Sequence, residues 1–236
     1  MTSLYTLTDT LYLQVPSLLH LNVASCLQLT NKGVELLASM TKLQHLNLDF
    51  CKKVTDDGIF TLSQLTGLTS LSMQGCGSWC KQVGCFKMAA LQHMPNLAEL
   101  NLAEGHFQPL ALLPLGRLTS LTQLNVRSCK RLSESDLQAI GSLQRLQHLN
   151  LEACQVVTSA NMKHVQPLQQ LTFLTMARNH SLSDAAIAQL MSMTRLQHLE
   201  LTDCPGITEP ALDKLYVALP KLRTLQSNGI DKEVVQ

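Results

Sequence analysis

The 236-residue chain carries 18 Lys and Arg residues against 17 Asp and Glu residues, which gives a formal net charge of +1. Such an even balance provides no field that would hold nucleic acid or an anionic lipid surface, and neither partner is expected. No apolar run approaches the ~20 residues that a membrane span requires, and the first residues lack the basic stretch of a signal peptide. The sequence therefore predicts no membrane insertion, and we expect an intracellular, cytoplasmic protein.

Most of the chain is a repeat. The clearest unit starts at Leu43 with the pattern Leu-x-x-Leu-x-Leu-x-x-Cys, and Leu68 starts the same pattern 25 residues later. Between them, Ile59, Leu62 and Leu65 recur near helical spacing. Fixed self-similarity of this length is typical of a solenoid, in which each unit buries its apolar face against its neighbours.

The repeats divide the chain into three parts. Residues 1–17 precede the first complete unit and have apolar residues at helical spacing, so they are predicted to form an N-terminal cap or a partial repeat. Residues 18–230 form the repeat domain, and residues 231–236 are a polar C-terminal tail. Ser227 stands where the last unit should place an inward apolar residue, so we expect a terminal strand with no neighbour to cover it.

Each unit is predicted to contain a short strand, a turn and a helix. The Leu-x-Leu segment alternates inward apolar with outward polar residues, as strands do, and the second half has helical periodicity. In four units a hydroxyl residue precedes an acidic first turn, which predicts a helix N-cap. These pairs are Thr55-Asp56, Ser133-Glu134, Ser183-Asp184 and Thr208-Glu209.

Two neighbouring units depart from the pattern. Four residues are inserted between Cys76 and Met88, in a segment that holds Trp79 and the off-register thiols Cys80 and Cys85. Trp79 is predicted to tuck under the loop in the place that Val54 takes in the unit of Leu43, and the alternative is that it protrudes as a contact residue. In the following unit, residues 97–120, glycine replaces the cysteine and two prolines fall where a helix should run. We expect an irregular or 3₁₀ segment there.

Six of the eight cysteines close a repeat unit. One thiol per unit, at a position that faces the core, is typical of a small buried hydrophobic residue rather than of a disulfide framework. We therefore predict reduced, structural cysteines, which agrees with an intracellular location. They are Cys26, Cys51, Cys76, Cys129, Cys154 and Cys204.

The pattern Leu-x-x-Leu-x-Leu-x-x-Cys, followed by Val/Ile/Leu, Thr/Ser, Asp/Glu and a helical Ile/Leu-x-x-Leu, resembles the cysteine-containing leucine-rich repeats. Those repeats are best known from F-box substrate receptors and antagonist-of-mitotic-exit-like proteins, and no F-box is recognisable in this sequence. The resemblance covers about eight units, residues 18–230. It implies an α/β fold, a right-handed horseshoe with a parallel sheet on the concave face and helices on the convex face, and binding of proteins.

Repeat arithmetic aligns the outward residues of the strands into columns on the concave face. The first column holds four histidines and Phe173, the second is mostly asparagine, and further columns follow at the strand ends. Such a polar, varied surface with isolated aromatic and Arg residues is typical of a protein-binding face. The predicted partner-binding residues are His45, Asn47, Asp49, Phe50, Arg127, Glu152, Phe173, Arg178, Glu200 and Asp203.

The function predicted from the sequence is a non-catalytic interaction module, either a scaffold or a subunit of a larger assembly, with protein partners and no cofactor. A ubiquitin-ligase substrate receptor or adaptor, implied by the resemblance, is the first alternative. A metal-dependent protein that uses the loop of residues 76–85, with His93 as a further ligand, is the second. Glu99, Glu104 and Glu152 can meet across the open sheet, but no catalytic motif accompanies them, so no enzyme and no metal site are predicted.

Overall fold

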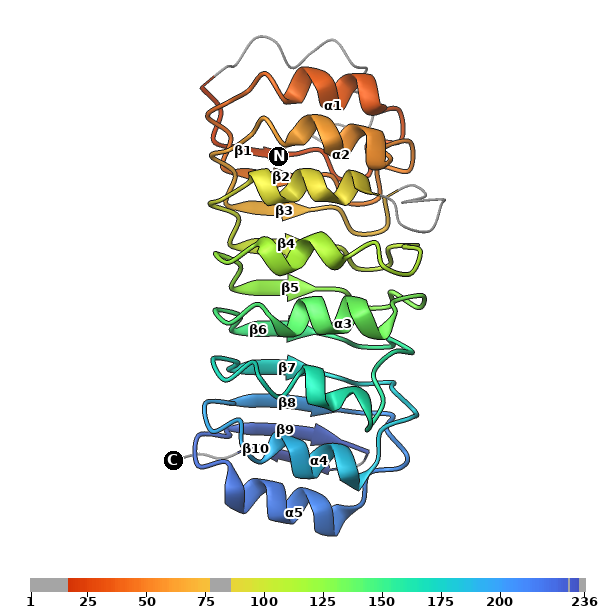
Figure 1. Ribbon diagram of the computed structural model, residues 1–236, viewed down its shortest axis with the longest axis vertical. Coiled ribbons are helices and arrows are strands. Elements are labelled where there is room, and N and C mark those ends of the chain that lie inside the picture. The colour runs from red at the N-terminus through yellow and green to blue at the C-terminus, as the bar shows by residue number, and fades with distance from the viewer. Residues whose placement is uncertain (1–16, 77–85, 229, 234–236) are drawn as a thin grey trace.

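Short parallel strands, one per unit, form a single open sheet (Figure 1). The computed structural model describes residues 17–76, 86–228 and 230–233. Each strand pairs with the strand of the next unit, in sequence order. The parallel strands are β1 (His20–Asn22), β2 (His45–Asn47), β3 (Ser70–Ser72), β4 (Glu99–Asn101), β5 (Gln123–Asn125), β6 (His148–Asn150), β7 (Phe173–Thr175), β8 (His198–Leu201) and β9 (Thr224–Ser227).

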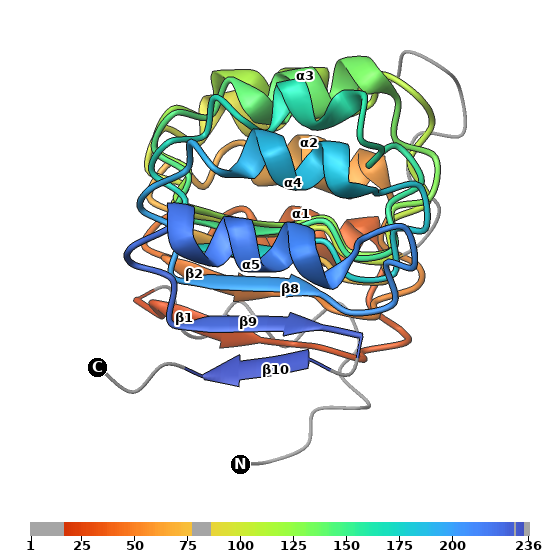
Figure 2. The ribbon, with the colours of Figure 1, turned by 90° about the horizontal axis from the view of Figure 1, so that it is seen from below.

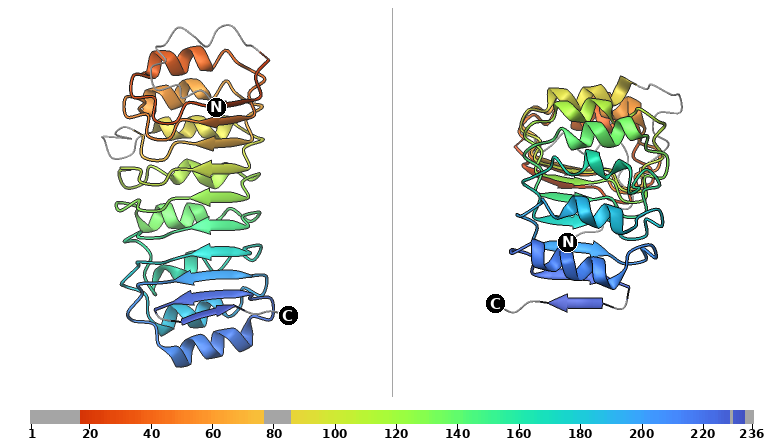
Figure 3. Two further views of the ribbon diagram at one scale, coloured as in Figure 1. Left: turned by 180° about the vertical axis from the view of Figure 1, so that it is seen from behind. Right: turned by 60° about the horizontal axis from the view of Figure 1, so that its bottom comes forward.

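The helices form a second layer on one face of this sheet, as the end-on view in Figure 2 shows. The α-helices are α1 (Asn31–Leu37), α2 (Asp56–Leu62), α3 (Glu134–Gly141), α4 (Asp184–Leu190) and α5 (Glu209–Ala218). The 3₁₀-helices are η2 (Phe86–His93), η3 (Leu113–Arg117) and η4 (Asn161–His164). The opposite face of the sheet is uncovered by helices (Figure 3). The predicted architecture of concave sheet and convex helices is confirmed.

The repeated leucines fill the space between the two layers. Leu43, Leu68 and Leu121, for example, are fully buried. Burial of one such side chain contributes about 1.5–3 kcal/mol, and because a unit contacts only its neighbours the gain comes from stacking. The core is therefore one continuous apolar layer between the sheet and the helices, along the length of the solenoid.

The six cysteines that close a repeat unit, here called the ladder cysteines, are free, buried thiols, as predicted. Each of five donates its S–H to a carbonyl of the preceding unit, so the position joins adjacent units as well as filling space. The pairs are Cys51 with Val23 (3.2 Å), Cys76 with Leu48 (2.9 Å), Cys129 with Leu102 (3.3 Å), Cys154 with Val126 (3.1 Å) and Cys204 with Met176 (3.4 Å).

Two units replace this thiol in different ways. Asn179 is 4% exposed and its Nδ2 donates to the carbonyls of Leu151 and Met176, both at 2.9 Å, so a carboxamide replaces the thiol as donor. At Gly105 a Cβ would lie 2.1 Å from the ring of Phe107, which is 1% exposed. The phenylalanine therefore fills the volume that the missing cysteine side chain leaves.

The proline-broken unit depends on a buried carboxylate from the next unit. Asp136, in α3, is fully buried and accepts hydrogen bonds from the backbone N–H groups of Leu110 (2.9 Å) and Leu112 (2.8 Å). The same carboxylate accepts the N–H of Ser133 (2.8 Å) and its hydroxyl (2.6 Å), which forms a capping box. One side chain thus satisfies donors that the irregular segment before η3 leaves without helical partners.

The predicted N-cap residues stand at the helix starts, but only one of the four side chains caps its own helix. Ser133 caps its own helix, whereas Thr55, Ser183 and Thr208 form no side-chain cap bond. Instead a side chain at or just before the helix start of one unit accepts the N–H of the next unit's N-cap residue, because adjacent units stack closely. The pairs are Asn31 with Thr55 (2.9 Å), Ser159 with Ser183 (2.9 Å) and Asp184 with Thr208 (2.8 Å).

The helical half is less regular than the sequence predicted. The 3₁₀ segment expected between residues 97 and 120 is present as η3, but η2 and η4 are also 3₁₀ where full helices were expected. For η4, Pro167 lacks the N–H that the carbonyl of Lys163 would need in an α-helix, and its ring would clash with that carbonyl there. Asn161 also donates its side-chain amide to the carbonyl of Val156 at 2.9 Å, which competes with helix formation.

The end of the sheet also differs from the expectation. Strand β10 (Ile230–Glu233) pairs antiparallel with β9, with Ile230 opposite Ser227. Ser227 is consequently 7% exposed rather than uncovered. The boundary predicted at residue 230 falls inside this hairpin, and β10 rather than β9 is the last strand. The predicted cap at residues 1–16 and the loop of residues 77–85, with Trp79, Cys80 and Cys85, lie outside the described residues.

Candidate functional site

The uncovered face of the sheet presents columns of side chains in register. Strand pairing aligns the first column from β1 to β9 and the second column two residues further along each strand. The first column is His20, His45, Ser70, Glu99, Gln123, His148, Phe173, His198 and Thr224. The second is Asn22, Asn47, Ser72, Asn101, Asn125, Asn150, Thr175, Glu200 and Gln226. The alignment predicted from the repeat period is confirmed, including the strand positions of His45, Asn47, Phe173 and Glu200.

The asparagine column has a structural role. The Oδ1 of Asn47 accepts the backbone N–H of Asp49 at 2.8 Å, and Asn150 does the same for Glu152 at 2.9 Å. These bonds close a turn at the end of the strand and fix the orientation of the carboxamide, so that its N–H groups point away from the backbone turn. Asn101 uses its Nδ2 to donate to the Ser72 hydroxyl at 2.9 Å.

The chain turns sharply after every strand. At the residue before each ladder position φ is positive, and apart from Gly75 (55°) these residues are not glycines, as at Phe50 (59°) and Arg178 (60°). A side chain in this left-handed conformation costs about 1–2 kcal/mol. The neighbouring unit compensates, because the N–H of Phe50 donates to the carbonyl of Gln74 at 2.7 Å. Predicted site residues thus project from a rigid turn.

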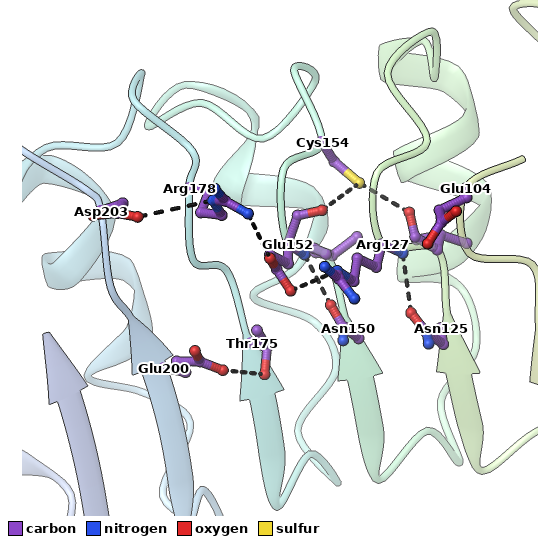
Figure 4. A network of polar contacts seen from close by, with 12 residues as sticks. Glu104, Asn125, Arg127, Asn150, Glu152, Cys154, Thr175, Arg178, Glu200 and Asp203 are labelled. Carbon is purple, nitrogen blue, oxygen red and sulfur yellow. Dashed lines mark hydrogen bonds and ion pairs between the residues drawn. The ribbon is translucent and has the colours of Figure 1, made fainter. Parts of the chain in front are cut away.

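Four predicted residues at the C-terminal side form one chain of ion pairs (Figure 4). Arg127 Nε lies 2.9 Å from Glu152 Oε2, without the alignment of a hydrogen bond. Arg178 lies 3.7 Å from the other oxygen of Glu152 and 3.8 Å from Asp203. The Glu152 side chain is only 17% exposed, whereas that of Arg178 is 58% exposed. The network therefore has a half-buried centre and an accessible guanidinium at its rim.

An aromatic group lies on the same face. The Phe173 ring stacks on His148 and tilts against His198, with centroid distances of 5.8 Å in both cases. Phe173 is 36% exposed, so part of its ring is open to a partner. At the other end His20 and His45 stack at 4.2 Å. Apolar surface is thus available on the sheet at two places.

The remaining predicted residues lie at the ends of β2. Asp49 accepts the Ser72 hydroxyl at 2.6 Å and the N–H of Gln74 at 2.7 Å, and Gln74 donates to Glu104 at 2.9 Å. Phe50 packs over Gly75, where a Cβ would lie 2.8 Å from its ring, and the Lys52 ammonium is 5.3 Å from the ring centroid. The predicted site is therefore divided into a β2 group and a group from β5 to β8.

A shallow groove of about 310 Å³ lies between these groups, over strands β3 to β7. Its polar lining includes Ser70, Glu99 and Gln123, with Phe173 at one end. The carboxylates Glu99 and Glu104, which were recognised in the columns but not predicted as binding residues, lie in or beside this middle section. Their charge and their register were both visible in the sequence, whereas the groove was not.

The side chains of the uncovered sheet face offer hydrogen-bonding and charged groups, whereas the thiols are buried in the core. Burial raises the pKa of the thiols, to about 11 at Cys51 and about 12 at Cys154, so they are protonated and poor nucleophiles at neutral pH. Among the described residues, no group of three or more His, Cys, Asp or Glu side chains has an arrangement that would hold a metal ion. None of the described helices has the length and apolarity needed to cross a bilayer.

Comparison with known proteins agrees with this architecture. The family model of the leucine-rich repeat matches residues 39–63. No curated protein sequence matches the chain.

Among solved structures, an internalin C2 of Listeria monocytogenes has 20% identity and a TM-score of 0.61, with 82% of this chain and 72% of that chain covered. The plant peptide hormone receptor RGFR1, in complex with RGF2, has 17% identity and a TM-score of 0.57 over 90% and 32% of the two chains. A leucine-rich-repeat protein of Leptospira interrogans has 17% identity and a TM-score of 0.54 over 89% and 60%. At these identities the likeness concerns the fold, which is a leucine-rich-repeat solenoid.

Proposed function

We propose that this leucine-rich-repeat solenoid is a non-catalytic interaction module that binds a protein partner, or fixes subunits of an assembly, through the concave face of its sheet. The observation that carries the proposal is the register of the strands, which presents side chains in ordered columns without covering helices. Because the backbone beneath them is paired throughout the parallel sheet, little conformational entropy is lost on binding.

The anchors of this interface are Phe50, Arg127, Phe173 and Arg178. Aromatic and Arg side chains are enriched among the residues that dominate binding energy in protein interfaces. Phe173 offers an exposed ring, and Arg178 offers a guanidinium that is already oriented by two carboxylates. Asp49, Glu152, Glu200 and Asp203 supply charge complementarity, and His45 and Asn47 supply further hydrogen bonds.

The plant receptor of the same fold supports a protein or peptide partner, since its structure contains a bound peptide hormone. The alternative function, a ubiquitin-ligase receptor, is supported by the resemblance of the repeats alone. It predicts a ligase subunit among the proteins that co-purify with the chain. The metal-dependent alternative requires the loop of residues 77–85, and zinc analysis of the purified chain tests it.

The test is capture of partners from an extract of the source organism by the tagged chain and by two double variants. Phe173→Ala with Arg178→Ala changes the concave face. Phe60→Ala with Arg145→Ala makes the same chemical change outside it, since Phe60 is 62% exposed on α2. Partners identified by mass spectrometry should be lost only from the first variant. Unchanged capture by the first variant, with an unchanged circular dichroism spectrum, would overturn the proposal.

A further inference from the structure

The concave face is acidic, although the chain as a whole is not. Six carboxylates stand in its columns and turns, against two guanidinium groups, while the formal charge of the chain is +1. The acidic residues are Asp49, Glu99, Glu104, Glu152, Glu200 and Asp203, and the basic ones are Arg127 and Arg178, with the Lys52 ammonium over the Phe50 ring at the edge of the face. The surplus of Lys and Arg therefore lies on the other surfaces, and the acidic character belongs to this face.

The two guanidinium groups neutralise only one side of the face. Both are engaged with Glu152, and Arg178 also with Asp203. Over β2 to β4, by contrast, the carboxylates have neutral partners: Glu104 accepts from Gln74, and Glu99 accepts from Gln123 at 3.1 Å. Among the ion pairs of the described residues, none joins a lysine or arginine to Asp49, Glu99 or Glu104.

Glu99 lines the groove that Phe173 closes at its far end, whereas Asp49 and Glu104 stand in the turns at the strand ends, bonded to Ser72 and Gln74. Neighbouring strands are about 4.8 Å apart, so the distance from Glu99 on β4 to Phe173 on β7 is about 14 Å, which about four residues of extended chain can span. An aromatic face attracts cations, as a carboxylate does. The groove thus presents a carboxylate at Glu99 and an aromatic ring at Phe173, both of which attract positive charge.

We propose that the segment bound by this groove is a basic one: an extended peptide segment of a partner protein, rich in Lys or Arg, that lies across strands β3 to β7. One cationic side chain pairs with Glu99, another with Glu104, and a third side chain covers the Phe173 ring. The inference rests on the proposed function, because it concerns the partner of the same face. An acidic segment is repelled by the same charges.

The test uses two fluorescein-labelled peptides of equal length, oligo-arginine and oligo-glutamate, and fluorescence anisotropy at low ionic strength. The arginine peptide should bind and the glutamate peptide should not. Glu99→Gln with Glu104→Gln should weaken binding of the arginine peptide about tenfold, because loss of each charge is expected to weaken binding about threefold to fivefold. The matched control, Glu35→Gln with Glu209→Gln, removes two exposed charges from α1 and α5 and should leave affinity within about twofold.

Equal weakening by both double variants would overturn the inference, since it would show attraction to the overall charge rather than to the groove. Partner capture separates this failure from failure of the proposed function. If capture depends on Phe173 and Arg178 but not on Glu99 and Glu104, the concave face binds a partner that is not basic. If capture depends on none of the four, both proposals are wrong. Circular dichroism of every variant checks that the fold is retained.

Discussion

Replacement of Asp136 by Asn is expected to destabilise the protein far more than its small change in shape suggests. The carboxylate accepts four hydrogen bonds, three on Oδ2 and one, from Leu112, on Oδ1. An asparagine has a single acceptor oxygen, so its best orientation keeps the three bonds and turns its NH₂ group towards the N–H of Leu112. Leu112 is fully buried, and no water can replace the lost acceptor.

The magnitude follows from these contacts. An orphaned buried N–H costs about 1–3 kcal/mol, and loss of the negative charge weakens the three remaining bonds. Together we expect a loss of about 3 kcal/mol in the free energy of unfolding. For a chain of this size that lowers the melting temperature by about 6–12 °C. Urea titration followed by far-UV circular dichroism measures the change directly.

Asp184→Asn is the matched control for this prediction. Asp184 also accepts two hydrogen bonds from the next unit, from the N–H and the hydroxyl of Thr208, both at 2.8 Å, but it is exposed. Asparagine can keep the first bond and donate in the second, so the expected loss is below about 1 kcal/mol. Similar losses in the two variants would refute the argument that Asp136 is needed for the buried donors of the irregular segment.

Three further predictions concern the core. The folded pKa of Cys51 is raised to about 11 and that of Cys76 to about 12, so the stability that their neutral form contributes is complete below about pH 9 and is lost as pH rises through these values. The urea concentration at the unfolding midpoint should therefore decrease as the pH is raised above about 9. In native protein at neutral pH the six ladder thiols should react with Ellman's reagent only as fast as the chain unfolds. Rapid reaction of all eight cysteines would contradict this. Gly105→Ala should lower stability by about 1–3 kcal/mol because its Cβ meets the Phe107 ring, whereas Gly67→Ala, with 3.6 Å to its nearest neighbour, should cost less than about 1 kcal/mol in the same titration.

The regular part of the fold was predictable because its period is fixed. Once Leu43 and Leu68 set the spacing, the positions of the strands, the buried thiols and the columns of the concave face followed. The neighbours of Phe173 on β6 and β8 are those that the arithmetic gives. Sequence reasoning also placed Arg127, Glu152 and Arg178 in adjacent units, which the ion pairs of Figure 4 confirm as neighbours.

The irregular features of the fold depend on contacts between particular side chains of neighbouring units. A repeat consensus does not show such contacts, because it keeps only what the units share. Asp136 follows the predicted N-cap residue Ser133 by three positions, and its bonds to Leu110 and Leu112 arise only when α3 stacks on the preceding unit. Phe107 fills space for the same reason. For β10 a local signal did exist, since Asn-Gly at residues 228–229 is the usual dipeptide of a two-residue hairpin turn.

The groove could not be predicted in this way, because it depends on which column residues are short and which are long. Ser70 and Ser72 line it at the β3 end, and Phe173 lines it at the β7 end. The composition of the columns indicates the chemistry of such a surface but not where the surface is raised or hollowed. The charge imbalance across the face was readable from the sequence once the columns were aligned.

The hairpin of β9 and β10 restricts how the molecule can be lengthened. A duplicated unit, such as residues 146–170, can be spliced between two existing repeats, since each strand there offers a parallel edge on both sides. The same unit cannot be appended after β10, because the reversed strand occupies the edge where a further parallel strand would have to add. Lengthening by tandem duplication is therefore blocked at the β10 end, and the groove between β3 and β7 is where an inserted unit would change the length of a bound segment.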